Sequence, residues 1–188
     1  MTQNMNASNI NNNNTINIHE KQTVVNIIED ENNRLENKKD SIKSELLNEV
    51  ISYIKKQSPK SNTNLPYYIV EHALDKDFDI CFMLGQTQIE TNFGTVGIGK
   101  KSSRKSLFGV YKTYKNYDAC IKDYIRIVQN NYLGNKKTHH NLLKNYVTLR
   151  GARYAENPKY EQTLRKTYYN IKRHTNIDTL QKEYNECT

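Results

Sequence analysis

The chain has 188 residues, enough for one domain and a tail, and its 28 Lys and Arg against 20 Asp and Glu give a net charge of +8. Hydrophobic content is low at 36%, and no apolar run approaches the roughly 20 residues that a membrane-spanning helix requires. The first ten residues lack the basic start and apolar centre of a signal peptide. We therefore expect synthesis in the cytoplasm and no membrane span.

The positive charge is confined to the second part of the chain. Residues 1–60 hold 8 basic and 8 acidic residues, whereas residues 61–188 hold 20 basic and 12 acidic residues. A basic domain suits an anionic polymer, either nucleic acid or cell wall, although a lysine-rich surface can also be simply well solvated. Because no helix-turn-helix or zinc-finger pattern is present, we expect no specific nucleic-acid binding.

Cysteine and histidine spacing gives no sign of a disulfide framework or a metal site. Cys81, Cys120 and Cys187 are odd in number and form no Cys-x-x-Cys pair. The first two lie in apolar helical contexts, which predicts core residues rather than nucleophiles. His139 and His140 are adjacent and cannot both face one ion from a helix. We expect neither a metal nor a cofactor.

The first quarter of the chain changes from polar to helical. Residues 1–22 are rich in Asn and predict a disordered polar tail. From about residue 24 to 57 the pattern becomes helical, since Ile28, Leu35 and Ile42 repeat every seven residues and other apolar residues continue the stripe. A short coiled coil and a first core helix beginning near residue 44 both fit.

The remainder predicts an all-α domain, with only residues 106–110 hinting at strand. Between its helices, residues 94–106 form a glycine-containing basic loop of the kind that often contacts substrate. The apolar segment at residues 78–91 predicts the central helix of the fold. The other predicted helices cover residues 66–74, 116–131, 142–149 and 158–173.

Glu90 lies where the central helix meets the glycine-containing loop. A carboxylate in the last turn of a buried helix, beside Ile89 and Phe93, is poorly solvated, and poor solvation raises the pKa of a carboxyl group. Such a residue stays protonated near neutral pH and can act as a general acid. The alternative is an ordinary Glu on the solvated side of the helix.

Four short segments form an ordered set. Residues 90–95 read Glu-Thr-Asn-Phe-Gly-Thr, residues 106–110 read Ser-Leu-Phe-Gly-Val, and residues 154–160 read Tyr-Ala-Glu-Asn-Pro-Lys-Tyr. They resemble the E-S-x-W/F-G-T, N-L-F-G-I and Y-A-T-D-P-x-Y elements of bacterial and phage glucosaminidases, which are flagellar- and autolysin-type peptidoglycan hydrolases. Residues 114–132 resemble the Y-x-s-x-x-x-S-I-x-D-Y stretch of the same family. The resemblance covers about residues 45–175.

This resemblance implies a lysozyme-like helical domain, with a reduced or absent β-lobe, that cleaves peptidoglycan in the manner of an N-acetylglucosaminidase. Glu90 matches the catalytic acid, and Tyr154 matches the motif tyrosine near the cleaved sugar, although a core tyrosine with a backbone partner is the alternative. Gln86 lies one helical turn before Glu90, so its amide could reach the same cleft. The other expected substrate-binding residues are Phe93, Phe108 and Tyr160, with pure packing as the alternative for the two phenylalanines.

The chain departs from the family after residue 110. Only residues 111–116 precede the next helix, and they contain no acid, so the hairpin that can supply a second carboxylate is missing. Asp118, Asp123 and Glu156 are candidates elsewhere. The alternatives are single-acid chemistry, as in muramidases or lytic transglycosylases, and an inactive structural protein of the same fold.

We expect three parts: a polar tail with a possible docking helix at residues 1–44, a catalytic domain at residues 45–175 and a C-terminal tail at residues 176–188. A hydrolase without an export signal, in an Asn- and Lys-rich sequence, is typical of a phage protein. It would be an endolysin released to the cell wall or a component of the virion. Residues 1–44 would then dock to virion proteins or pair with a second copy.

Overall fold

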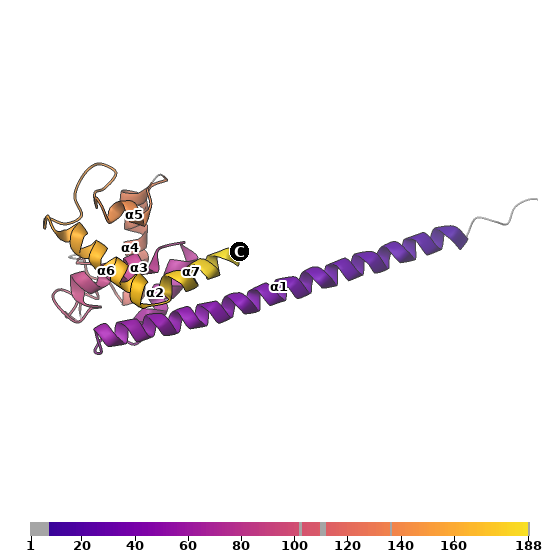
Figure 1. Ribbon diagram of the computed structural model, residues 1–188, viewed down its shortest axis with the longest axis horizontal. Helices are drawn as coiled ribbons and strands as arrows, with labels where there is room; N and C mark the ends of the chain where they lie inside the picture. The colour runs from indigo at the N-terminus through magenta and orange to yellow at the C-terminus, as the bar shows by residue number, and fades with distance from the viewer. Residues whose placement is uncertain (1–7, 102, 110–111, 136, 188) are drawn as a thin grey trace, which may run out of the picture. The chain divides into compact units, whose positions relative to one another are not determined.

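The computed structural model describes residues 8–101, 103–109, 112–135 and 137–187. Within these residues the regular secondary structure is almost entirely helix, which confirms the all-α prediction (Figure 1). The one β interaction among them is an isolated antiparallel bridge between Val147 and Arg153. The helices are α1 (Ser8–Gln57), α2 (Leu65–Asp75), α3 (Ile80–Thr91), α4 (Tyr117–Val128), a π-helical turn η1 (Gln129–Leu133), α5 (His139–Leu142), α6 (Tyr160–His174) and α7 (Ile177–Glu186).

Helix α3 is the central helix, as predicted. Its first eight residues, Ile80 to Thr87, are all buried, and helices α2, α6 and α7 pack against it. A helix that is apolar on every side is stable only when other elements cover it. Asp79 caps its start, because the carboxylate accepts hydrogen bonds from the Phe82 amide and the Tyr168 hydroxyl of α6, each at 2.9 Å.

The second part of α1 belongs to the core. Ile42, Leu46, Val50, Tyr53 and Ile54 are buried and recur every three or four residues along one face of the helix. The core therefore begins at Ile42, slightly before the expected residue 44. The helix ends at Gln57, and the amide of the next residue, Ser58, donates to the Ile54 carbonyl at 2.7 Å.

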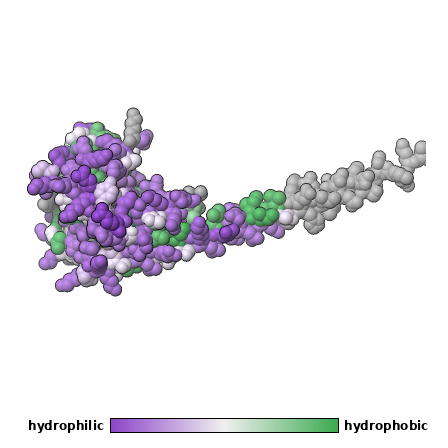
Figure 2. All heavy atoms as spheres, in the orientation of Figure 1, coloured by the Kyte–Doolittle hydropathy of each residue, from purple (hydrophilic) through white to green (hydrophobic). Residues whose placement is uncertain are grey.

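The first part of α1 carries exposed apolar side chains. Figure 2 shows apolar atoms gathered on the coloured part of α1. The predicted disordered tail is wrong from Ser8 onward, because α1 begins there, and residues 1–7 lie outside the described part. Asn has a low helix propensity, but extending an existing helix costs much less than nucleating one. The exposed apolar residues are Val24, Val25, Ile27, Ile28 and Leu35.

The helix predicted over residues 142–149 is wrong beyond Leu142, where α5 ends. From Tyr146 onward the backbone makes hydrogen bonds to other segments instead of helical ones. The Tyr146 amide donates to the Glu161 carboxylate at 3.3 Å, and the Tyr146 carbonyl accepts from the Tyr154 amide at 2.9 Å. Residues 106–109 likewise form no strand.

The C-terminal segment is a packed helix where a tail was expected over residues 176–188. Ile177, Leu180 and Gln181 of α7 are buried. The Gln181 amide group donates to the Phe78 carbonyl at 2.9 Å and accepts from the Ile80 amide at 3.0 Å. Helix α7 therefore satisfies backbone groups at the start of α3, which the sequence pattern does not reveal.

No helix in the described part of the chain has the length and apolar character needed to cross a bilayer.

Because the buried side chains of α1 begin at Ile42, we expect a protein lacking residues 1–38 to keep the stability of the full chain. Removing residues 1–44 also removes Ile42 and should lower the free energy of unfolding by about 1–3 kcal/mol. Chemical denaturation of both truncated proteins tests this, and equal stabilities would show that Ile42 contributes nothing to the core.

Candidate active site

Glu90 is half-buried in the last turn of α3, where the chain reverses sharply. Asn92, Phe93 and Gly94 have φ values of 43°, 56° and 81°, so three consecutive residues adopt the left-handed conformation that ends helices. Ser58 holds this turn, because its hydroxyl donates to the Asn92 carbonyl at 3.0 Å. The turn directs the chain away immediately after Glu90 and fixes the position of the carboxylate.

The carboxylate of Glu90 lies between two segments that are distant in sequence. One oxygen, Oε1, accepts a hydrogen bond from the Tyr160 hydroxyl at 2.5 Å. The other, Oε2, lies against the backbone of Gly109, so closely that a Cβ atom on this residue would be 2.3 Å away. A larger residue would have to displace the Glu90 carboxylate, and the φ of +69° found here also favours glycine.

Burial raises the pKa of Glu90, and the hydrogen bond from Tyr160 opposes this effect in part. The direction is the one that a general acid requires, because a raised pKa keeps more of the carboxyl group protonated near neutral pH. The alternative of a fully solvated Glu90 does not agree with its half-buried position.

Residues 106–109 are held against Glu90 by contacts from three elements. The Thr91 hydroxyl of α3 donates to the Leu107 carbonyl at 2.8 Å, and the Tyr154 hydroxyl donates to the Phe108 carbonyl at 2.7 Å. The Phe108 ring stacks on the Tyr124 ring of α4 with centroids 3.6 Å apart and planes 7° from parallel. These contacts place the neighbouring glycine beside the carboxylate.

A cluster of stacked tyrosine rings packs next to Glu90, which it contacts through Tyr160. The Tyr146 and Tyr154 rings stack with centroids 4.3 Å apart, and the Tyr160 ring lies 5.3 Å from the Tyr154 ring. Burial raises the pKa of Tyr154 well above its usual range, so its hydroxyl remains a neutral donor.

Gln86 is not accessible to substrate in this structure, which corrects the prediction. It is fully buried, and its amide oxygen accepts hydrogen bonds from Tyr124 at 2.5 Å and Tyr146 at 3.0 Å. Gln86 lies one helical turn, about 5.4 Å, before Glu90 along the axis. It is fully buried whereas Glu90 is half-buried, so Gln86 lies deeper in the core.

The two predicted aromatic residues also face inward. Phe93 and Phe108 are each only 1% exposed, and the Phe93 ring packs edge-on against Tyr53 at 6.2 Å. They shape the site by packing, and in this conformation neither presents a face to substrate. Tyr160 is the predicted residue that contacts Glu90 directly. Sequence reasoning missed Gly109, although its place in the Ser-Leu-Phe-Gly-Val segment was a usable signal.

The two aspartates considered as a second carboxylate are engaged in ion pairs. Burial alone would raise the pKa of Asp123, but hydrogen bonds from Lys112, Arg126 and Tyr114 lower it to about 2. Asp118 forms contacts with His72 at 2.6 Å and Lys122 at 3.1 Å that likewise lower its pKa against the effect of burial. A carboxylate held in this way is a weak base and poorly suited to activate water.

Cys81 and Cys120 are buried, as the sequence predicts, and neither forms a disulfide in the structure. Burial raises the pKa of Cys120 to about 12, so its thiol is protonated and unreactive. In the described part of the chain, no group of three or more His, Cys, Asp or Glu side chains is arranged to hold a metal ion.

Comparison with protein families matches residues 67–173 to the glucosaminidase family, described as mannosyl-glycoprotein endo-beta-N-acetylglucosaminidase. The match covers more than half of the chain and includes Glu90, Gly109, Tyr154 and Tyr160. The chain therefore belongs to the glucosaminidase family and is a glycoside hydrolase that acts on peptidoglycan. Comparison with curated proteins finds no match, and neither does comparison with solved structures.

We expect Tyr160→Phe to move the pH dependence of activity. The Tyr160 hydroxyl favours the ionised form of Glu90, so its loss raises the pKa of Glu90 further. If protonated Glu90 is required, activity is lost as pH rises through this pKa, and the alkaline limb of kcat/KM therefore shifts to higher pH. The acidic plateau should fall by less than about tenfold, because one neutral hydrogen bond contributes about 1 kcal/mol.

The matched control is Tyr132→Phe. The Tyr132 ring packs edge-on against Tyr154 at 5.9 Å, so the change removes a hydroxyl from the same cluster of rings. The alkaline limb of kcat/KM should stay at its wild-type pH in this variant. If the limb also stays at its wild-type pH in Tyr160→Phe, the Tyr160 hydroxyl does not affect the pKa of Glu90.

Gly109→Ala should lower kcat/KM by about 10- to 100-fold, because the new methyl group displaces the Glu90 carboxylate and such misplacement is costly in catalysis. Gly151→Ala is the control, since Gly151 has a φ of +88° and nothing within 4 Å of an added Cβ. Both variants carry comparable backbone strain, of about 1–3 kcal/mol, but only the first should lose activity. Steady-state kinetics and thermal denaturation distinguish the two effects.

Proposed function

We propose that Glu90 is the general acid of this glycosidase and protonates the glycosidic oxygen as the bond breaks. The observation that carries the proposal is the environment of its carboxylate: half-buried, with a raised pKa, between Tyr160 and Gly109. Proton donation to a leaving oxygen is the step that a carboxyl group of raised pKa performs in glycoside hydrolysis.

We propose that the bond cleaved is of the N-acetylglucosaminidase type, in the interior of the glycan strand. The family match and the four family-like segments support this assignment. In this account Tyr154 is a positioning residue, because its hydroxyl holds the Phe108 carbonyl and thereby the segment that contacts Glu90.

A single-acid mechanism is the second candidate. The ion pairs of Asp118 and Asp123 favour it, because they occupy the carboxylates that would otherwise serve as base or nucleophile. The N-acetyl group of the substrate or a positioned water would then complete the reaction, and an anhydro sugar among the products would mark a lytic transglycosylase. Glu156, which is exposed in the 154–160 segment, is the remaining candidate among the predicted acids.

We further propose that the protein is encoded by a phage and acts either as a virion component or as an endolysin. The Asn- and Lys-rich composition supports this origin. Residues 1–44 would attach the enzyme to virion proteins or to a second copy, and the exposed Val24, Val25, Ile27, Ile28 and Leu35 supply an apolar surface for either contact.

Digestion of purified peptidoglycan by the wild type and by Glu90→Gln tests the role of Glu90. The amide keeps the shape of the side chain but cannot donate this proton, so activity should fall by about 10²- to 10⁴-fold. Mass spectrometry of the released muropeptides identifies the bond from the reducing-end sugar. Equal activity of the two proteins would exclude Glu90 as the acid, and no release by the wild type from several wall types would favour an inactive structural protein.

The same variant should be at least as stable as the wild type at neutral pH. Since folding raises the pKa of Glu90, the protonated form is favoured in the folded state, and that contribution to stability is lost as pH rises through the raised pKa. Glutamine removes the buried charge. Thermal denaturation at pH 5 and pH 8 should show the advantage of Glu90→Gln growing at the higher pH.

A further inference from the structure

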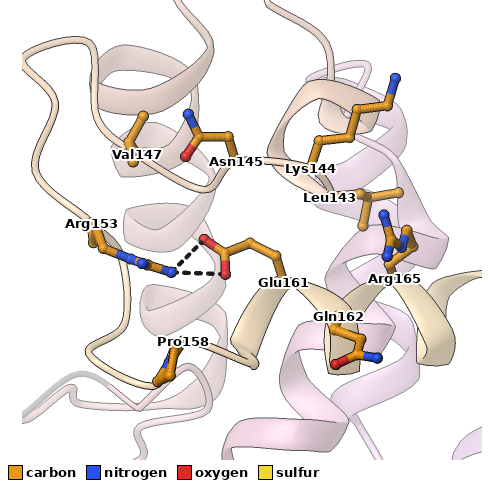
Figure 3. A pocket seen from close by; sticks show the side chains of 9 residues that line it. All are labelled: Leu143, Lys144, Asn145, Val147, Arg153, Pro158, Glu161, Gln162 and Arg165. Atoms are coloured by element: carbon orange, nitrogen blue, oxygen red, sulfur yellow. Dashed lines mark hydrogen bonds and ion pairs between the residues drawn. The ribbon is translucent and has the colours of Figure 1, made fainter.

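A polar pocket of about 370 Å³ is lined in part by residues at the two ends of the 154–160 segment (Figure 3). This volume is within the range of small-molecule sites in proteins. The pocket is formed by the residues after α5, by Arg153 and by the first turns of α6. Its polar lining consists of Lys144, Asn145, Arg153, Glu161, Gln162 and Arg165.

The pocket has an excess of positive charge. Glu161 is its one acidic lining residue, and its carboxylate accepts hydrogen bonds from Arg153 at 3.1 and 3.2 Å and from the Tyr146 amide at 3.3 Å. Figure 3 shows this pair on one side of the pocket and Lys144 and Arg165 on the other. No acidic side chain of the described residues forms a salt bridge with either of these two cations.

An unneutralised pair of cations around a polar pocket suits a carboxylate. Arg binds carboxylates through two parallel hydrogen bonds, and Lys adds a point charge. The amides of Asn145 and Gln162 can donate to the same ligand. The first turn of the 15-residue helix α6 also lines the pocket and contributes the positive end of its dipole.

The backbone connects this pocket directly to the catalytic carboxylate. Arg153 and Glu161 line the pocket, while their neighbours Tyr154 and Tyr160 hold the Phe108 carbonyl and Glu90. Adjacent Cα atoms are only about 3.8 Å apart, and an extended peptide of four residues spans up to about 14 Å. A peptide attached to a sugar near Glu90 therefore extends well beyond the carboxylate, over the surface formed by neighbouring segments such as residues 153–161.

From this arrangement we propose that the pocket binds a free carboxylate of the peptide that peptidoglycan carries on its N-acetylmuramic acid residues. The inference rests on the proposed glycosidase function and adds a determinant of substrate choice to it. Lys144 and Arg165 form the charge contact, and the Arg153–Glu161 pair provides the fixed opposite wall. The enzyme thereby prefers glycan strands that bear peptides over bare strands.

The test compares kcat/KM on peptidoglycan strands that carry peptides and on the same strands after an amidase has removed them. The variant Lys144→Gln/Arg165→Gln should lose about tenfold on peptide-bearing strands, the scale expected for hydrogen bonds to charged groups, and nothing on bare strands. The control Lys55→Gln/Lys56→Gln removes the same charge from exposed positions at the end of α1 and should not alter the preference.

Equal losses on both substrates would show that the two cations only attract the polymer or support the fold, and no loss on either substrate would show that they do not recognise it.

If wild type cleaves neither substrate, the proposed glycosidase function is wrong, but the pocket can still be tested by itself. Calorimetry with a soluble N-acetylmuramyl tetrapeptide then decides the role of the pocket. Weaker binding by the double variant, and by wild type to the peptide with amidated carboxyl groups, supports the proposal, whereas unchanged affinity overturns it.

Discussion

The carboxylate of Glu90 is kept partly out of water, and the arrangement of the candidate site around it is consistent with this constraint. A buried carboxylate is costly when ionised, so the site combines a low-polarity position with a single short hydrogen bond from Tyr160. Burial raises the pKa and the hydrogen bond lowers it. The net effect is a raised pKa, which is the direction that proton donation to a glycosidic oxygen requires.

Several elements of the fold together fix the position of the Glu90 carboxylate. Helix α3 carries it, and the close approach of Gly109 is maintained because Thr91 and Tyr154 hold the carbonyl groups of the two preceding residues. Tyr160 reaches the same carboxylate from the start of α6, 70 positions later in the chain. Groups held by packing and hydrogen bonds from several elements lose little freedom when a substrate binds.

Much of the fold and the identity of the catalytic candidate could be predicted from the sequence, because both depend on local patterns. The apolar run of α3 predicts a buried helix, and Glu90 follows from its position at the end of that run. The contacts made by the candidates could not be predicted. Helical spacing places Gln86 on the same face as Glu90 but does not reveal that two tyrosine hydroxyls occupy its amide oxygen.

The errors in helix assignment share a physical cause. Residues 142–149 have apolar residues at helical spacing, yet the backbone of Tyr146 is engaged by Glu161 and Tyr154 from outside the segment. The polar C-terminal segment is ordered because Gln181 satisfies backbone groups near the start of α3. Such tertiary hydrogen bonds override local propensity, and no pattern within either segment encodes them.

The most direct test of this account is the titration of Glu90 itself, followed by NMR in protein carrying ¹³C-labelled glutamate carboxyl groups, with Glu90→Gln used to assign the signal. We expect Glu90 to titrate above the usual value for glutamate, about 4.3, and to move further upward in Tyr160→Phe. A pKa at or below that of an exposed glutamate would contradict the account, because Glu90 would then be ionised at neutral pH and could not serve as the proton donor.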